Sequence, residues 1–338
     1  MTTVSLVRCP SYEQAALGAA LDRALAPLGG LEAFVRRGDR VLVKPNLLAG
    51  EPSERATTTH PALIETLLRR LLDLGARPVI GDDPAFGTLE RVCEACGVAE
   101  VARRYGVPLT PFNRPMWVKS PRPRVRPTFC IDQAALEADV ILNVPKLKAH
   151  RQLYFTAAIK SLYGCMPGKR KAFWHMACGP DARFARLLVA FAYTVRPALT
   201  VVDGVVAMER DGPKGGDPFP LGLLFAGTDV AAVDTLIAAV IHARPADSLL
   251  LNAACQLDIG TPWMAKIAVA GESLAACARA DFRLPDLVGT FFSPTRLARS
   301  IWRNYRMTRL SKAKRGMRNA SVKAIDSPLL VDERGREL

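Results

Sequence analysis

The sequence lacks the long apolar runs of a membrane-spanning protein. No stretch of its 338 residues approaches the roughly 20 apolar residues that a transmembrane helix needs. Its first residues, MTTVSLVRCPSYEQ, contain neither the basic nor the apolar segment of a secretory signal. From these two absences we expect a globular cytoplasmic protein.

Common motifs of nucleotide and acyl chemistry are absent as well. No G-x-G-x-x-G follows the first predicted strands, and no G-x-S-x-G elbow occurs. The glycine-rich basic segment at residues 164–171 lacks the spacing of a Walker A motif and follows a predicted helix rather than a strand. The sequence therefore gives no support to a standard dinucleotide fingerprint, a P-loop or a serine hydrolase.

The eight cysteines are scattered and do not form the dense pattern of a disulfide framework. Cys93 and Cys96 form a C-x-x-C pair, but no second pair lies at zinc-finger spacing. They fall in a predicted helix that ends at Gly97, so we interpret them as two small, half-buried thiols. An alternative metal or cluster site would require folding to bring together Cys165, His175 and Cys178, either alone or with one of Cys93 and Cys96.

Positive charge is unevenly distributed along the chain. The net charge is +14, and ten lysines and arginines lie between Arg296 and Lys323 with no aspartate or glutamate among them. Trp302 and Tyr305 interleave with these arginines, as in helices that lie on membrane surfaces. We predict a basic helical tail over residues 291–338, which either packs as a solvated helix or contacts an anionic membrane surface through residues 296–323. Charge alone gives only nonspecific attraction, so no specific nucleic-acid partner is expected.

Short apolar runs alternate with helical patterns along most of the chain. This order predicts one α/β domain over residues 1–290, with a largely parallel twisted sheet and helices on both faces. The ranges predicted as strands include 40–43, 78–80, 138–144, 199–202 and 221–227. The ranges predicted as helices include 12–28, 61–74, 88–96, 154–163, 181–194 and 229–241. Five prolines between residues 110 and 128 exclude a long helix there and predict an extended surface excursion.

Polar side chains directly follow five of the predicted strands. Ligands of open α/β sheets bind outside the carboxyl ends of the strands, so we expect these side chains to converge on one crevice. Four junctions contribute Lys44, Asn46, Asp82, Asp83, Lys146, Lys148, His150 and Asp203. The fifth contributes Asp229, which we interpret as a helix cap. A lysine at such a junction is expected to bind ligand while adding little to stability, and Lys146 is the example we would test.

These residue types indicate three kinds of role. The set expected to bind a phosphate or carboxylate is Lys44, Asn46, Thr58, Thr59, Lys146, Lys148 and Lys160. The set expected to carry out acid–base catalysis is Asp82, His150 and Asp203. A divalent metal would instead use the oxygens of Asp82, Asp83 and Asp203. We expect His150 and His175 to lie in basic loops rather than on apolar helix faces.

Several segments resemble the DUF362 family of bacterial and archaeal proteins. They lie at residues 41–48, 57–84, 138–150, 156–171 and 201–216 and follow the order of the family. Many members carry an added ferredoxin-like module with a C-x-x-C-x-x-C-x-x-x-C-P run. Only Cys255 and Cys277 follow Cys178 here, so that module is missing and a ferredoxin-type cluster is not expected. The family pattern carries over onto the strand-end residues and onto His60 and Gly164.

Three functions are open at this point. The first is an enzyme that acts on a small anionic substrate or cofactor in the strand-end crevice. Its reaction would be group transfer, or oxidoreductase chemistry with an external ferredoxin-like partner. The second is an iron–sulfur or metal-binding accessory protein. The third is a peripheral membrane or polyanion-binding module that uses the basic tail.

Overall fold

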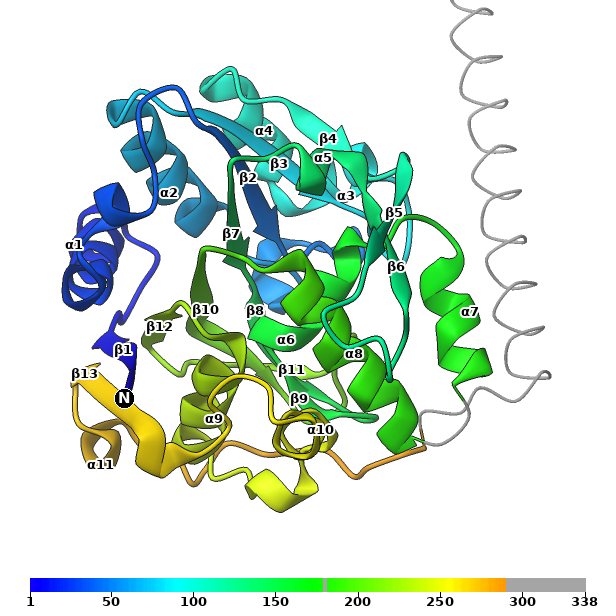
Figure 1. The fold of residues 1–338 in the computed structure, drawn as a ribbon. Helices are drawn as coiled ribbons and strands as arrows, with labels where there is room; N and C mark the ends of the chain where they lie inside the picture. Colours follow the sequence, from blue (N-terminus) through cyan, green and yellow to red (C-terminus); the bar gives the residue numbers. More distant parts are fainter. Residues whose placement is uncertain (179–180, 290–338) are drawn as a thin grey trace, which may run out of the picture. The chain divides into compact units, whose positions relative to one another are not determined.

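The computed structural model describes residues 1–178 and 181–289 and shows one large sheet covered by helices on both faces (Figure 1). This confirms the predicted α/β class. The predicted basic tail, residues 291–338, lies outside the described residues. In the described part of the chain, no helix is both long enough and apolar enough to cross a membrane.

The centre of the sheet is parallel. Its strands follow in the order β10-β7-β2-β3-β4, and each is parallel to its neighbours. Because these strands share one direction, their carboxyl ends meet at the same edge of the sheet. Their bounds are β2 (Arg40–Pro45), β3 (Arg77–Asp82), β4 (Leu109–Pro111), β7 (Val140–Val144) and β10 (Leu199–Glu209).

The rest of the sheet is mixed. Strand β12 (Leu223–Gly227) is antiparallel to β10 and places Gly227 opposite Thr200, near the start of β10. Strand β1 (Thr2–Arg8) is antiparallel to β12, and β13 (Ile267–Gly271) is parallel to β1. The carboxyl end of β12 therefore lies at the opposite edge from those of the parallel strands. The expectation that all five strand junctions share one crevice was wrong for this fifth one.

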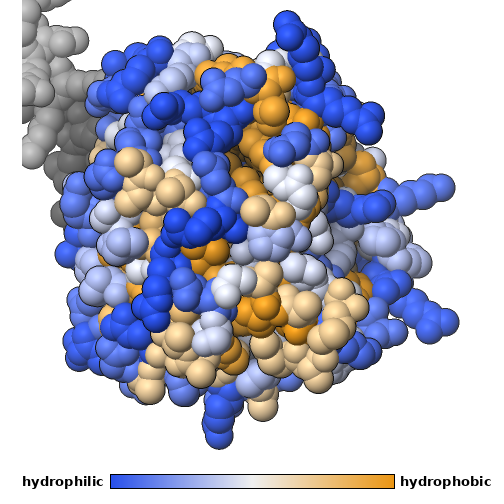
Figure 2. All heavy atoms as spheres, turned by 90° about the vertical axis from the view of Figure 1, so that its left-hand side faces the viewer, coloured by the Kyte–Doolittle hydropathy of each residue, from blue (hydrophilic) through white to orange (hydrophobic). Residues whose placement is uncertain are grey.

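The side chains of the central strands alternate between two apolar cores. Val41 and Val43 of β2 face one core, and Leu42 faces the other. The first core is covered by α1 (Gln14–Leu25), α2 (Pro61–Asp73), α3 (Leu89–Cys96) and α4 (Val98–Arg104). The second is covered by α6 (Ala158–Ser161), α8 (Asp181–Val195), α9 (Val230–Val240) and α10 (Leu249–Leu257). On the side where α1 lies, apolar and hydrophilic residues are interspersed on the surface (Figure 2).

Helix caps follow from the sequence at two places. Pro61 begins α2, where its missing N–H costs nothing, and Gly75 adopts a φ of 73° just beyond the end of that helix. The predicted helix at 61–74 is thereby confirmed. Asp229 accepts hydrogen bonds from two backbone amides in the first turn of α9, so its predicted role as a cap is also confirmed.

The segment after β7 differs from the prediction. Residues expected in a loop form β8 (Lys146–His150), which is parallel to β10 and antiparallel to β9 (Tyr154–Thr156). The helix predicted at 154–163 was therefore wrong over its first residues, and α6 has only four. A strand pairing with β8 satisfies backbone groups that would otherwise be buried without partners, and this tertiary pairing overrides the local helical pattern.

The proline-rich segment is extended, as predicted. Strands β5 (Pro115–Lys119) and β6 (Thr128–Asp132) pair antiparallel in a separate two-stranded sheet. Trp117 of β5 is 59% exposed, as expected for a surface excursion. The remaining α-helices and strands of the described residues are α5 (Gln133–Leu136), α7 (Arg170–Ala177), β11 (Asp217–Phe219) and α11 (Leu274–Cys277).

Candidate functional site: buried lysines at the strand ends

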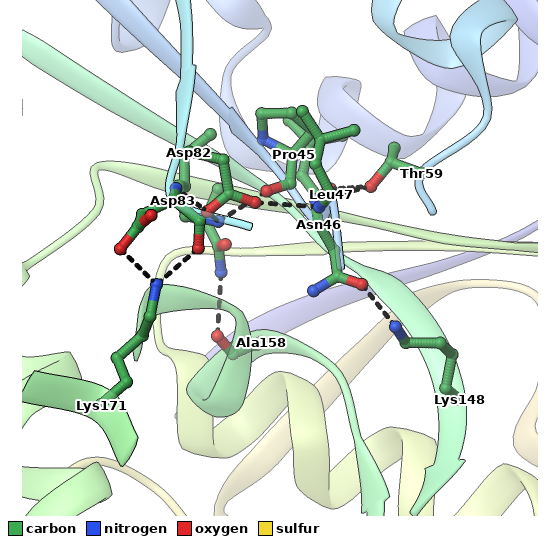
Figure 3. A network of polar contacts seen from close by, with 12 residues as sticks. Pro45, Asn46, Leu47, Thr59, Asp82, Asp83, Lys148, Ala158 and Lys171 are labelled. Carbon is green, nitrogen blue, oxygen red and sulfur yellow. Dashed lines mark hydrogen bonds and ion pairs between the residues drawn. The ribbon is translucent and has the colours of Figure 1, made fainter. Parts of the chain in front are cut away.

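Polar side chains from the parallel strands come together at their shared carboxyl edge. We call this group the strand-end site. It consists of Lys44, Asn46, Asp82, Asp83, Lys146, Lys148, His150, Lys160, Lys171 and Asp203. Figure 3 shows its central part, with Asp82 and Asp83 at the end of β3 and lysines approaching from two sides.

A buried ion pair joins the ends of the adjacent strands β2 and β3. The ammonium of Lys44 lies 2.9 Å from Oδ1 of Asp82, and neither side chain is more than 4% exposed. Lys44 also donates a hydrogen bond to the carbonyl oxygen of Pro45, and Asp82 accepts one from the amide of Leu47. The charges are thus both paired and hydrogen-bonded, which is what a buried ion pair requires.

The backbone at Gly164 packs directly against this ion pair. A Cβ atom at that position would lie 2.2 Å from Oδ1 of Asp82 and 2.9 Å from Nζ of Lys44. Only glycine allows such a close approach. The segment that leads into α7 is therefore fitted to the Lys44–Asp82 pair.

A second buried pair joins the first residue of β8 to the middle of β10. The ammonium of Lys146 lies 2.9 Å from Oδ2 of Asp203, and both side chains are fully buried. Asp203 also accepts hydrogen bonds from the Tyr12 hydroxyl at 2.7 Å and from the His60 amide at 2.9 Å. Burial lowers the pKa of Lys146, and the neighbouring Asp203 carboxylate opposes that shift.

The carboxylate of Asp203 binds at the amino end of α2. Asp203 accepts the amide of His60, the residue that precedes α2, and so occupies the place where an external phosphate would bind. Thr59 is fully buried and donates its hydroxyl to the carbonyl oxygen of Val144. Thr58 is fully buried as well. Both threonines are therefore buried, and Thr59 holds the strand ends together rather than facing solvent.

Two further lysines have no carboxylate partner within the described residues. Lys148 donates hydrogen bonds to Oδ1 of Asn46 at 2.6 Å and to the carbonyl oxygen of Thr57 at 2.9 Å, and both acceptors are neutral. The ammonium of Lys160 lies 5.2 Å from the centre of the Tyr163 ring. Lys148 is 2% exposed, whereas Lys160 is partly exposed. The strand-end site therefore holds more positive than negative charge.

Burial, reinforced by the excess positive charge, shifts the pKa values of three groups in the site. Burial, followed by repulsion from Lys160 and Lys146, lowers the pKa of Lys148 to about 7. Burial and the charges of Lys171 and Lys44 lower the pKa of Lys160 to about 8. Burial together with Lys160 and Lys148 lowers the pKa of His150 well below its usual range. Near neutral pH, His150 is therefore neutral and the two lysines are part-protonated.

A third ion pair ties α7 to the end of β3. Lys171 lies 2.7 Å from Oδ2 of Asp83, and the same oxygen accepts the amide of Gly168 at 2.7 Å. Both side chains of the pair are partly exposed. This contact holds the 164–171 segment beside the strand-end site (Figure 3).

Comparisons with known proteins identify the family. The sequence matches the family described as "Domain of unknown function (DUF362)" over residues 41–239. The chain belongs to this family. It is 40% identical over 245 residues to a thylakoid-associated protein of Synechocystis sp., covering 72% of this chain and 76% of that protein.

A solved structure also aligns with this DUF362 protein. It is the lactate racemase apoprotein from Thermoanaerobacterium thermosaccharolyticum, with a TM-score of 0.41 and 12% identity. The alignment covers 68% of this chain and 54% of that one, so the DUF362 chain spans about half of the racemase. At this level of similarity the alignment supports no conclusion about activity.

The proposed metal ligands are not grouped as the sequence suggested. Asp82, Asp83 and Asp203 each pair with a different lysine, and the described part of the chain contains no cluster of three or more acidic, histidine or cysteine residues suited to a metal. Cys165 and Cys178 are buried thiols, and burial raises the pKa of Cys165 to about 12. We therefore build no function on a metal or cluster at these residues.

Two histidines lie elsewhere than the sequence predicted, and one tyrosine of the site was not predicted at all. His150 lies on β8 and His175 on α7, so neither is in the basic loop that we expected. The role of Tyr12 was not predicted, because nothing around it in the sequence indicates that its hydroxyl donates a hydrogen bond to Asp203. The alternation in K-L-K-A-H did carry a signal: Leu147 and Ala149 enter the core, which places Lys146, Lys148 and His150 on the other face of β8.

Proposed function

We propose that the strand-end site binds a small molecule that carries a phosphate or carboxylate group, and that the protein is an enzyme acting on that molecule. The observation that supports this proposal is the uncompensated charge of Lys148 and Lys160. Burying the Lys148 ammonium, and part of Lys160, without a carboxylate is costly, and a bound anion would offset that cost. Partial exposure of Lys160 and Asn46 leaves the site open to a ligand.

The same lysines favour proton-transfer chemistry. A lysine with a pKa of about 7, such as Lys148, exists at neutral pH as both ammonium and free amine. A group of this kind is suited to act as a general acid or base, because its pKa matches the working pH. The neutral His150 imidazole lies on the same face of β8, and its Nδ1 accepts a hydrogen bond from the Gln152 amide, so its Nε2–H would donate a hydrogen bond to the bound molecule.

Calorimetric titration of the full-length protein with small anions would test the proposal. We suggest inorganic phosphate, malonate and citrate as probes, with Lys148→Met and Lys160→Met as variants and Lys119→Met, an exposed lysine of β5, as the matched control. A charge-assisted contact contributes about 1.5–3 kcal/mol, so each site variant should weaken binding at least tenfold. Equal binding by the wild type, both site variants and the control would exclude anion binding at these lysines.

We further propose that the protein associates with an anionic membrane surface. Two observations favour this: the ten cations between residues 296 and 323, and the name of the Synechocystis relative, which describes a thylakoid-associated protein. Each lysine or arginine near an anionic surface contributes about 1 kcal/mol before salt screening. Full-length protein should co-sediment with anionic vesicles at low salt, and a chain truncated after Pro294 should not. If the full-length protein does not co-sediment with such vesicles, this second proposal is wrong.

A further inference from the structure

A second basic site lies between the β5–β6 hairpin, α7 and α8. A cavity of about 460 Å³ opens there, bordered by the hairpin loop, by one side of α7 and by the first turns of α8. Four arginines contribute to its lining: Arg124, Arg126, Arg183 and Arg186. We call this cavity the arginine pocket. None of the strand-end residues lines it, so its ligand would be distinct from the one proposed above.

The arginine pocket has no negative charge of its own. No aspartate or glutamate lines the cavity. Within the described residues, none of the four arginines forms an ion pair with a carboxylate, and Arg186 has only a 3.4 Å hydrogen bond to Gln256. Arginine side chains crowded without a counter-ion repel one another, and a multivalent anion would relieve that repulsion.

One arginine is held in place by an aromatic ring. The guanidinium of Arg126 lies over the Trp174 ring, 4.1 Å from its centroid. Stacking uses the face of a guanidinium and leaves its N–H groups free at the edge, where they can bind two oxygens of one phosphate. Arg126 is thus positioned before a ligand arrives, which reduces the conformational entropy lost on binding.

The remainder of the lining is apolar. Val125, Leu187 and Leu257 border the cavity beside the arginines, and Leu187 is 5% exposed. A bare inorganic anion would contact only the guanidinium groups. A molecule with an apolar or aromatic group would in addition remove these side chains from water.

We propose that the arginine pocket binds a phosphate ester with an apolar or aromatic group. The phosphate contacts Arg126 and the neighbouring arginines, and the organic group lies against Val125, Leu187 and Leu257. A phosphate monoester suits the pocket better than a carboxylate because it carries nearly two negative charges at neutral pH. Such an ester occurs either as a soluble metabolite or as the headgroup of an acidic lipid.

Calorimetric titration of the full-length protein with phenyl phosphate would test this proposal. We expect phenyl phosphate to bind at least tenfold more tightly than inorganic phosphate. The variants Arg126→Gln and Arg183→Gln should each weaken that binding at least fivefold. Arg36→Gln replaces an exposed arginine that precedes β2 and does not line the pocket, and it should leave the binding unchanged. Vesicles with phosphatidic acid, compared with phosphatidylcholine vesicles, distinguish a lipid headgroup from a soluble ester.

The controls separate this proposal from the strand-end one. Lys148→Met should retain the phenyl phosphate site, because Lys148 does not line the arginine pocket. Arg183 is exposed, and its side chain forms no hydrogen bond or ion pair with another described residue, so Arg183→Gln should keep the wild-type melting temperature even if Arg126→Gln does not. Undiminished phenyl phosphate binding by the Arg126→Gln/Arg183→Gln double variant would overturn the proposal. Loss of binding in Lys148→Met, with both arginine variants unaffected, would assign the ligand to the strand-end site instead.

Discussion

Lys146 and Asp203 form an ion pair from which solvent is fully excluded, with 2.9 Å between Nζ and Oδ2. The sequence had led us to expect a lysine that contacts ligand and adds little to stability. The structure changes that expectation, because Tyr12 and His60 also bond to the pair and complete its coordination. Removing one partner would leave the other charge buried and unpaired.

We predict that Lys146→Met and Asp203→Asn each lower the free energy of unfolding by about 3–5 kcal/mol. The double variant Lys146→Met/Asp203→Leu should lower the free energy of unfolding by less than the more destabilising of the two single variants does. The reason is that the double variant leaves no unpaired charge in the interior. Urea denaturation of all three variants measures these differences. Single losses below about 1 kcal/mol would show that water reaches the pair.

The low pKa of Lys148 makes stability depend on pH. In the folded protein this pKa is about 7, whereas an unfolded lysine titrates near 10.5. Between these values the unfolded chain binds more protons, so the free energy of unfolding should rise as pH increases from about 7 toward 10. The contribution is at most on the order of 5 kcal/mol, since one pKa unit corresponds to about 1.4 kcal/mol.

Thermal unfolding across this pH range, with and without phosphate, would measure the effect. Lys148→Met should flatten the rise, because its side chain does not titrate. A bound anion should stabilise the protein most at the lower pH values, where Lys148 and Lys160 are protonated. An identical pH profile for Lys148→Met and the wild type would contradict this assignment.

Gly164 provides a test of the close packing against the Lys44–Asp82 pair. Gly164→Ala places a methyl group within 2.2 Å of Asp82 and should cost about 1–3 kcal/mol through displacement of the backbone. Gly18→Ala is the matched control: it lies inside α1, and its Cβ would meet only the end of Arg70 at 3.5 Å. That change should stabilise the protein by about 0.5–1 kcal/mol. If the two variants show equal stability, the 164–171 segment is not fitted to the ion pair.

Lys160 should react unusually fast with acylating reagents. Only the free amine reacts, and a pKa of about 8 leaves roughly 300-fold more free amine at pH 7 than an ordinary lysine has. Mass spectrometry after brief acetylation at pH 7 should therefore find Lys160 modified before the exposed Lys119, and phosphate should slow the reaction. Modification of Lys119 first would indicate that Lys160 is either fully protonated or inaccessible.

The location of β12 could be predicted from the sequence, but its direction in the sheet could not. The apolar run at 221–227 correctly predicted a strand, and Asp229 correctly predicted the start of a helix. Strand direction, however, depends on which neighbour the strand pairs with, and β12 pairs antiparallel with β10. That choice moved its junction away from the other four.

The α/β class, most strand and helix positions, and the set of polar residues that follow the parallel strands could all be predicted from the amino-acid sequence. This prediction is possible because apolar periodicity is a local property of the sequence, and so are the prolines and glycines that mark the ends of helices and strands. Which lysines form ion pairs could not be predicted in this way and follows from the folded arrangement of the strands. Lys44 and Lys146 meet carboxylates 38 and 57 positions away, while Lys148 and Lys160 meet none in the described residues. Charge balance depends on distances through space, and those distances exist only once the strands have paired.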